Sequence, residues 1–287
     1  MIPQSQLSKL SNRLLKELGG RRIPEQTLER DYCIAWFLVG LSKVPLREKI
    51  AFKGGTALKR CHFENYRFSE DLDFTLLESL SSFDELKEAL APIYDIVKQE
   101  SNVTFSFSRS DSQPHQNTHT FYLAYEGPLP ATAMAKEIKV DVTIKESLVE
   151  NPTSCAVLRS YPEFSDLPLN AHVRTYPLAE IAMEKTVALL DRARTEPRDL
   201  YDLWFLLEQG SVDLDSCFHG IELKLQHRGK RLPDVRGEFE NKETRLRKTW
   251  VTRLSSQMNS LPEFDGVYRA VKRHLRQSKI TAAARKR

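Results

Sequence analysis

The sequence predicts an α/β (α+β) fold, in which two helices precede a mixed sheet and a helical bundle follows it. Three patterns support this. Apolar residues recur every three or four positions in 5–18 and 25–43, which predicts helices. Short alternating or β-branched segments between about 49 and 144 predict strands. Charged segments with helical spacing follow Pro177 and predict the bundle.

Local signals delimit each element along the chain. The strand 49–52 ends at a pair of glycines, and Thr56 is positioned to cap a helix over 57–63. Ser82 is positioned to cap another. The remaining expected elements are strands at 71–77, 103–108, 118–125 and 136–144, and helices at 83–100, 178–193, 197–209, 212–228, 236–257 and 264–278.

The composition is that of a folded protein. The chain has 287 residues, of which 40% are hydrophobic, enough for the cores of one or two domains. We expect an N-terminal domain with the leading helices over 1–170 and a basic helical domain over 171–287. No apolar run approaches the roughly 18 residues that cross a bilayer, so we expect a cytoplasmic protein without a membrane partner.

Charge is unevenly distributed along the chain. Residues 221–287 hold 18 basic and 7 acidic residues, whereas 1–220 hold 25 basic and 32 acidic ones. A basic C-terminal third fits contact with the phosphates of nucleic acid, and the alternative is a solvated helical surface.

Two glycines at the junction of a strand and a helix suit phosphate binding. Without side chains, Gly54 and Gly55 allow the backbone to approach a phosphate closely. The helix that follows offers free N–H groups and the positive end of its dipole, and Thr56 adds a hydroxyl donor. A glycine pair alone is a weak signal.

Three aspartates on predicted strands suit divalent cations. Asp71 and Asp73 alternate with apolar residues, so their side chains lie on one face, roughly 6–7 Å apart. Such carboxylates repel one another unless a cation lies between them. Asp141, in an apolar strand context, is the third. Mg²⁺ takes oxygen ligands, and two ions can clamp the attacking and leaving oxygens, so we expect two Mg²⁺, with Mn²⁺ as an alternative. An aspartate pair on a solvated strand face is the alternative reading.

A second polar group is expected on the helices after Pro177. Lys185 and Arg192 fall within an apolar helical stripe, which predicts that they line a cleft and meet an anion; the alternative is that their stems pack while their heads reach water. Asp199, in the first turn of the next helix, is either stabilised by the dipole or orients one of these cations. Asp202 is a further candidate.

These motifs resemble a known family. The segment KGGTALKR followed by RFSEDLDF, the later strand Lys-x-Asp, and a helical motif ending in RDLYDL resemble the AbiEii/AbiGii toxin nucleotidyltransferases, which include the MenT toxins. The resemblance covers roughly residues 25–210. It implies a polymerase-β-type nucleotidyltransferase core, with Asp71, Asp73 and Asp141 as metal ligands and Lys185 and Asp199 as catalytic residues. Ser69 matches the motif serine, a proposed site of self-modification in some members; a turn serine that bonds the backbone is the alternative.

The resemblance also implies a substrate and partners. An NTP would bind near Gly54, Gly55, Thr56 and Ser69, and Lys185, Arg192 and Asp202 would contribute to its binding. The expected acceptor is RNA, at the 3′ end of tRNA, and the expected partner is a cognate antitoxin. Two alternatives stay open: transfer to a small molecule or protein hydroxyl, and a non-catalytic module that binds nucleotide or RNA.

Overall fold

The computed structural model describes residues 1–78, 82–111, 117–131, 133–210 and 212–282. Contacts divide the chain into two compact units. Unit 1 comprises Met1–Glu146, Pro152–Tyr176 and Gln257–Asn259, and unit 2 comprises Ser147–Asn151, Pro177–Ser256 and Ser260–Arg287. Residues 283–287, which carry three of the basic residues counted above, lie outside the described part. No described helix is long and apolar enough to span a membrane.

Unit 1 is built on a mixed sheet of seven strands in the order β3-β4-β5-β2-β1-β7-β6. Strand β2 lies at its centre, antiparallel to β1 and parallel to β5. The predicted mixed sheet in an α+β fold is confirmed. The strands are β1 (Ile50–Lys53), β2 (Leu72–Leu76), β3 (Thr104–Ser110), β4 (Thr118–Glu126), β5 (Lys136–Thr143), β6 (Thr153–Ala156) and β7 (His172–Thr175).

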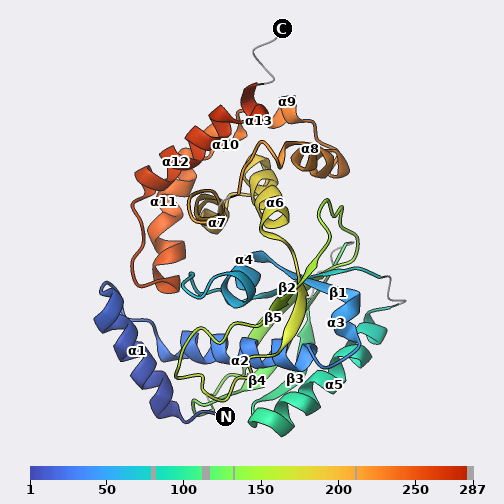
Figure 1. Ribbon diagram of the computed structural model, residues 1–287, viewed down its shortest axis with the longest axis vertical. Helices are drawn as coiled ribbons and strands as arrows, with labels where there is room; N and C mark the ends of the chain where they lie inside the picture. Colours follow the sequence, from blue (N-terminus) through green and yellow to red (C-terminus); the bar gives the residue numbers. More distant parts are fainter. Residues whose placement is uncertain (79–81, 112–116, 132, 211, 283–287) are drawn as a thin grey trace. The chain divides into compact units, whose positions relative to one another are not determined.

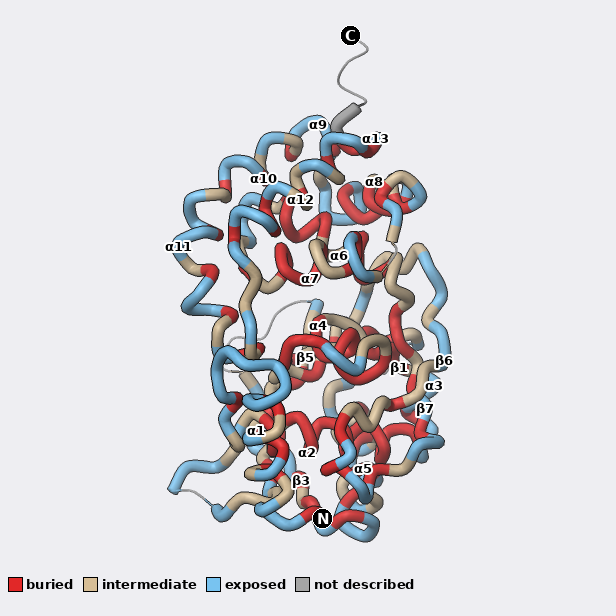
Figure 2. Tube along the Cα trace, turned by 60° about the vertical axis from the view of Figure 1, so that its left-hand side comes forward, coloured by how far each residue is buried: buried red, intermediate tan, exposed pale blue. Residues whose placement is uncertain are grey.

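Two long helices cover one face of this sheet (Figure 1). The side chain of Phe37 in α2 contacts the rings of Phe74 in β2 and Phe105 in β3. Helix α2 is buried along most of its length (Figure 2). The Ser82 side chain accepts a hydrogen bond from the Glu85 amide and caps α5, as predicted. The helices of unit 1 are α1 (Gln4–Leu18), α2 (Glu25–Leu41), α3 (Leu46–Lys49), α4 (Gly54–Ala57) and α5 (Phe83–Ser101).

The segment after β1 differs from its prediction. The helix begins at Gly54, with Lys53 at the N-cap position, and continues as a π-helical turn, η1 (Leu58–His62). The predicted cap at Thr56 is therefore wrong. Its hydroxyl lies within the helix and donates to the Asp71 carbonyl oxygen at 2.5 Å, so it joins the glycine turn to the start of β2.

Unit 2 is helical throughout its described part. The predicted continuous helix over 236–257 is interrupted at Lys242, and the one predicted over 212–228 begins only at Phe218. The helices are α6 (Leu178–Leu190), α7 (Pro197–Glu208), α8 (Phe218–His227), α9 (Leu232–Val235), α10 (Glu238–Asn241), α11 (Glu243–Leu254), α12 (Phe264–Gln277) and α13 (Lys279–Ala282), and the 3₁₀ turn η2 (Ser255–Gln257) leads from unit 2 into Gln257 of unit 1.

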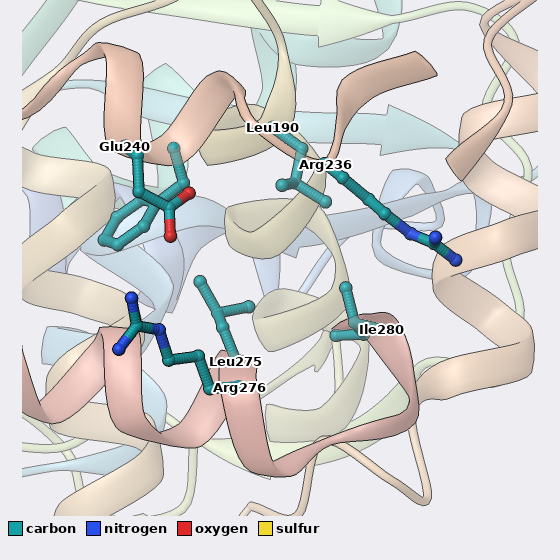
Figure 3. Close-up of a pocket in the computed structure, with 7 residues that line it drawn as sticks. Leu190, Arg236, Glu240, Leu275, Arg276 and Ile280 are labelled. Atoms are coloured by element: carbon teal, nitrogen blue, oxygen red, sulfur yellow. The ribbon is translucent and has the colours of Figure 1, made fainter. Parts of the chain in front are cut away.

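The core of unit 2 is closely packed. Figure 3 shows Leu190 of α6, Leu275 of α12 and Ile280 of α13 around a hollow of about 10 Å³. A space of this size holds one water molecule at most. This hollow is therefore too small to bind a nucleotide.

Candidate active site

The central strands of unit 1 carry polar residues on one face and apolar residues on the other. In β2, Leu72 and Phe74 are buried while Asp73 is partly exposed; in β5, Val140 and Val142 are buried while Asp141 is partly exposed. Successive side chains on a strand point to opposite faces. The apolar face lies against the helices, which leaves the aspartates on the other face.

The strand register aligns these aspartates in a row. Asp73 pairs directly with Asp141 across the parallel strands and with Lys53 across the antiparallel strands. Thr120 of β4 pairs with Asp141 and donates its hydroxyl to Asp141 Oδ1 at 2.6 Å. Directly paired residues share a face, so the two carboxylates are neighbours.

The strand predicted over 71–77 begins at Leu72, so Asp71 lies immediately before β2 and outside it. Lys139, the lysine of the Lys-x-Asp motif, to which the sequence analysis assigned no role, faces the same group. Its ammonium donates to Asp141 Oδ2 at 2.6 Å. Burial lowers the pKa of Lys139, but the hydrogen bond and charge of Asp141, with the charges of Asp71 and Asp73, outweigh burial and raise it. Its position two residues before Asp141 could have revealed it, because strand faces repeat every second residue.

This donor set fits a divalent cation. The charges of Asp71, Asp73 and Asp141 all act on the Lys139 ammonium, these carboxylates offer only oxygen ligands, and Mg²⁺ prefers such ligands. The Lys139 ammonium lies among them. Within the described ranges, no three His, Cys, Asp or Glu side chains form a ready-made metal cluster, so cation binding would require Lys139 to move and the carboxylates to converge.

The glycine turn lies against the aspartate row because it lacks side chains. Gly54 has a φ of 78°, a conformation that favours glycine, and a Cβ there would lie 2.5 Å from Asp73 Oδ2. A Cβ on Gly55 would overlap the Arg67 guanidinium and lie 3.3 Å from Ser69 Oγ. The glycines therefore admit polar side chains close to the backbone, Asp73 at Gly54 and both Arg67 and Ser69 at Gly55.

Arg67 and Ser69 are both buried beside this turn, at 3% and 7% exposure. The Arg67 guanidinium donates to Gln257 Oε1 at 2.9 Å, and Gln257 also belongs to unit 1. The structure thus brings Gly54, Gly55 and Ser69 together with the aspartates.

The predicted cation–aspartate group of unit 2 is an ion-pair cluster. Lys185 Nζ lies 2.8 Å from Asp199 Oδ1 and 2.8 Å from Asp202 Oδ2. Both aspartates are buried, with side-chain exposures of 2% and 0%. Burial raises the pKa of Asp199, but Lys185 and Arg194 outweigh that effect and lower it. The anion that Lys185 meets is therefore this aspartate pair.

Two arginines beside this cluster differ from expectation. Helix α6 ends at Leu190, so Arg192 lies in the following loop and not within the helical stripe predicted for it. Arg194, which the sequence reasoning did not single out, donates to Asp199 Oδ2 at 2.6 Å. Its role depends on the loop conformation, for which helical spacing gives no signal.

Solved structures of other proteins share this fold. MenT4, a nucleotidyltransferase toxin from Mycobacterium tuberculosis H37Rv, shares the fold at a TM-score of 0.64 and 14% identity, with 98% of this chain and 90% of that chain covered. JHP933 from Helicobacter pylori shares it at a TM-score of 0.56 and 16% identity, over 92% of this chain and 95% of that one. A comparison with curated proteins returns no match.

Residues 36–270 match the family model described as "Nucleotidyl transferase AbiEii toxin, Type IV TA system". The chain belongs to this family of toxin nucleotidyltransferases, and the resemblance inferred from its motifs is confirmed. Membership implies a nucleotide substrate and an antitoxin partner.

Proposed function

We propose that this protein transfers a nucleoside monophosphate from an NTP to the 3′ end of an RNA, namely tRNA, and thereby blocks translation in the cytoplasm. The observation that carries the proposal is the row formed by Asp73 and Asp141 on adjacent strands, with Asp71 two residues earlier, beside a diglycine turn. The excess of basic residues in 221–287 supports an RNA acceptor. A cognate antitoxin would suppress the activity.

Asp71, Asp73 and Asp141 would hold one or two Mg²⁺ ions, with Mn²⁺ as a substitute. When bound, Mg²⁺ supplies charge neutralisation at the phosphates and lowers the pKa of the acceptor hydroxyl. Gly54 and Gly55 allow the triphosphate to approach the backbone, and the three carboxylates fix the direction of attack. The acceptor oxygen forms a bond to the α-phosphorus, pyrophosphate leaves, and the hydroxyl proton passes to solvent.

The remaining predicted residues have supporting roles in this proposal. Lys185 and Arg192 contribute to binding of the triphosphate, and Asp199 and Asp202 orient Lys185. Thr56, whose hydroxyl is bonded to Asp71, holds the nucleotide-binding turn in place. Ser69, close to Gly55, borders the nucleotide.

The test is transfer of label from each of four α-labelled NTPs to total tRNA in the presence of Mg²⁺. We expect one or more NTPs to lengthen tRNA at its 3′ end, and Asp71→Asn to reduce the rate by about 1000-fold or more while the protein stays folded. Equal labelling by Asp71→Asn and wild type would refute the catalytic role and favour a binding module.

The same assay separates the alternative acceptors. Label on a small molecule or on the protein itself, with none on RNA, would show that this molecule and not tRNA is the acceptor. Ser69→Ala would abolish self-labelling if Ser69 were the hydroxyl modified. Acceptor affinity that falls steeply with salt indicates RNA, because phosphate contacts release counterions.

A further inference from the structure

A hollow of about 440 Å³ opens on the surface of unit 2, where the loop after α6 meets the α10–α11 junction. Its volume lies in the range of small-molecule sites. All residues that line it belong to unit 2. They are Arg192, Thr195, Glu238, Asn241, Lys242 and Arg245.

Two arginines of this hollow differ from the other cations near the end of α6. Lys230 lies 2.5 Å from Asp191, and Arg194 lies 2.6 Å from Asp199, so each has an acidic partner. Across the described ranges, neither Arg192 nor Arg245 forms an ion pair or a side-chain hydrogen bond. Both side chains are exposed and therefore available to a ligand.

The floor of the hollow adds a third cation. Lys242 is 5% exposed, and its ammonium donates to the carbonyl oxygens of Leu189 and Asp191 at 2.6 Å each. Those carbonyls end α6, so Lys242 fixes the α10–α11 junction to this helix. Burial lowers the pKa of Lys242 to about 8. An anion in the hollow would stabilise the charged ammonium.

The charges of the lining favour an anion. Of the lining residues, three are cations and one, Glu238, is acidic; the charges of Asp191 and Asp199 also act on Lys242. Thr195 and Asn241 add hydroxyl and amide donors. Guanidinium groups bind phosphate oxygens through two parallel hydrogen bonds, so the two exposed arginines suit a phosphate ligand.

A larger hollow in unit 1 lacks this character. It has a volume of about 500 Å³ and lies at the start of β5, about 17 Å along the strand from Asp141 at 3.3 Å per residue. Its cation, Lys136, is already paired with Glu29 at 2.8 Å. The unit 2 hollow is thus the better candidate for an anion.

We propose that the hollow bounded by Arg192, Lys242 and Arg245 binds a phosphate group of a phosphate ester. Arg192 and Arg245 contact the phosphate oxygens, and Lys242 supplies fixed positive charge beneath them. The phosphate comes either from the RNA backbone or from the NTP. The choice of these two ligands rests on the proposed function, whereas phosphate recognition here does not require the aspartates of unit 1.

The experiment measures binding without turnover. Full-length Arg192→Gln/Arg245→Gln protein is titrated with tRNA and, separately, with each NTP in the presence of EDTA. The matched control is Arg253→Gln/Arg269→Gln, which removes the same charge from exposed arginines of unit 2 outside the hollow. Thermal unfolding verifies that both variants fold; because neither hollow arginine forms an ion pair, we expect unchanged midpoints.

Two results support the proposal, and they identify the source of the phosphate. A roughly tenfold weaker affinity for tRNA, with a log–log salt slope shallower by about 1 to 2, assigns the site to RNA. A roughly tenfold weaker affinity for an NTP, with tRNA binding equal to the control, assigns it to the nucleotide. Affinities for both ligands within about twofold of the control overturn the proposal.

The outcome is independent of catalysis. If wild type binds tRNA through the arginines but transfers no nucleotide, the proposed function fails and this inference stands. If wild type transfers nucleotide and the arginine variant binds normally, the proposed function stands and this inference fails.

Discussion

The aspartate clusters of unit 1 and unit 2 both contain cations and differ in exposure. In unit 1, the charges of Asp71, Asp73 and Asp141 act on the Lys139 ammonium, and that of Asp71 also acts on Arg30. In unit 2, Asp199 and Asp202 face two cations, Lys185 and Arg194. Ion pairing alone therefore does not distinguish the two clusters.

The aspartates of the two clusters differ in how far they are buried. The aspartates of unit 2 have side-chain exposures of 2% and 0%, whereas the Asp141 side chain is 24% exposed. A buried charge must be paired, since an unpaired one costs several kcal/mol. A partly exposed cluster is open to a ligand. The comparison teaches that exposure, more than the presence of aspartates, distinguishes the candidate cation site.

The strongest test is the same substitution in both clusters. In unit 1, Asp141→Asn should reduce nucleotide transfer by about 1000-fold or more, because it removes a proposed ligand of the divalent cation. The free energy of unfolding in EDTA should change by less than about 1 kcal/mol, because partly exposed ion pairs contribute little. Transfer assays and urea denaturation measure the two quantities. Transfer within tenfold of wild type would contradict the role of Asp141.

In unit 2, Asp199→Asn should lower the free energy of unfolding by about 3 kcal/mol, because it leaves Lys185 and Arg194 short of one buried partner. Urea denaturation measures this, with Glu196→Gln as the control. The pKa of Asp199 is lowered in the folded protein, so its contribution is present above about pH 4 and is lost as the pH falls further. A difference from wild type that persists well below pH 4, or is absent at pH 7, would show that the pair is not structural.

The sequence identified the faces of the strands but not their register. Alternation in Asp71-Leu72-Asp73-Phe74 and Val140-Asp141-Val142 suffices to place the aspartates opposite the core, since side chains alternate along a strand. The direct pairing of Asp73 with Asp141 depends on which strands become neighbours. Which strands become neighbours depends on contacts throughout the sheet between residues far apart in the sequence.

Other features were missed because they depend on tertiary partners. Thr56 fits the sequence pattern of a helix cap, but its hydroxyl donates a hydrogen bond to the Asp71 carbonyl oxygen. The break at Lys242 follows from its bonds to the end of α6, which no local pattern encodes. The π-helical turn at Leu58–His62 likewise has no sequence signature that we could use.

A third kind of buried cation extends the comparison. Lys59, in the core of unit 1, is 0% exposed and bonds the Tyr161 hydroxyl at 2.8 Å. Burial lowers its pKa to about 7, whereas Lys185 has two carboxylates to keep it charged. Between pH 7 and about pH 10 the unfolded chain binds a proton that the folded one lacks, so the stability of the wild type should rise with pH.

The expected rise from Lys59 is about 1 kcal/mol per pH unit between pH 7.5 and 9, measured by urea denaturation as the difference between wild type and Lys59→Met. Subtraction removes the contribution of other titrating groups. Below pH 7 both forms of the chain hold the proton, and the difference should be constant. A constant difference between pH 7.5 and 9 would instead show that the aromatic rings of Phe68 and Tyr161 keep the ammonium charged.

The smallest expected effect concerns Lys139 in the aspartate cluster of unit 1. Lys139→Met removes the ammonium that stands among the three aspartates, so the metal-free protein should lose about 1 kcal/mol of stability through repulsion. The same change removes the competitor of a divalent cation, which should tighten Mn²⁺ binding by about fivefold. Thermal unfolding in EDTA and in Mn²⁺, with calorimetric titration, measures both, and Lys145→Met controls for the lost charge. If Lys139→Met bound Mn²⁺ more weakly than wild type, the Lys139 ammonium would assist binding of the divalent cation. The expectation that the ammonium competes with this cation would then be wrong.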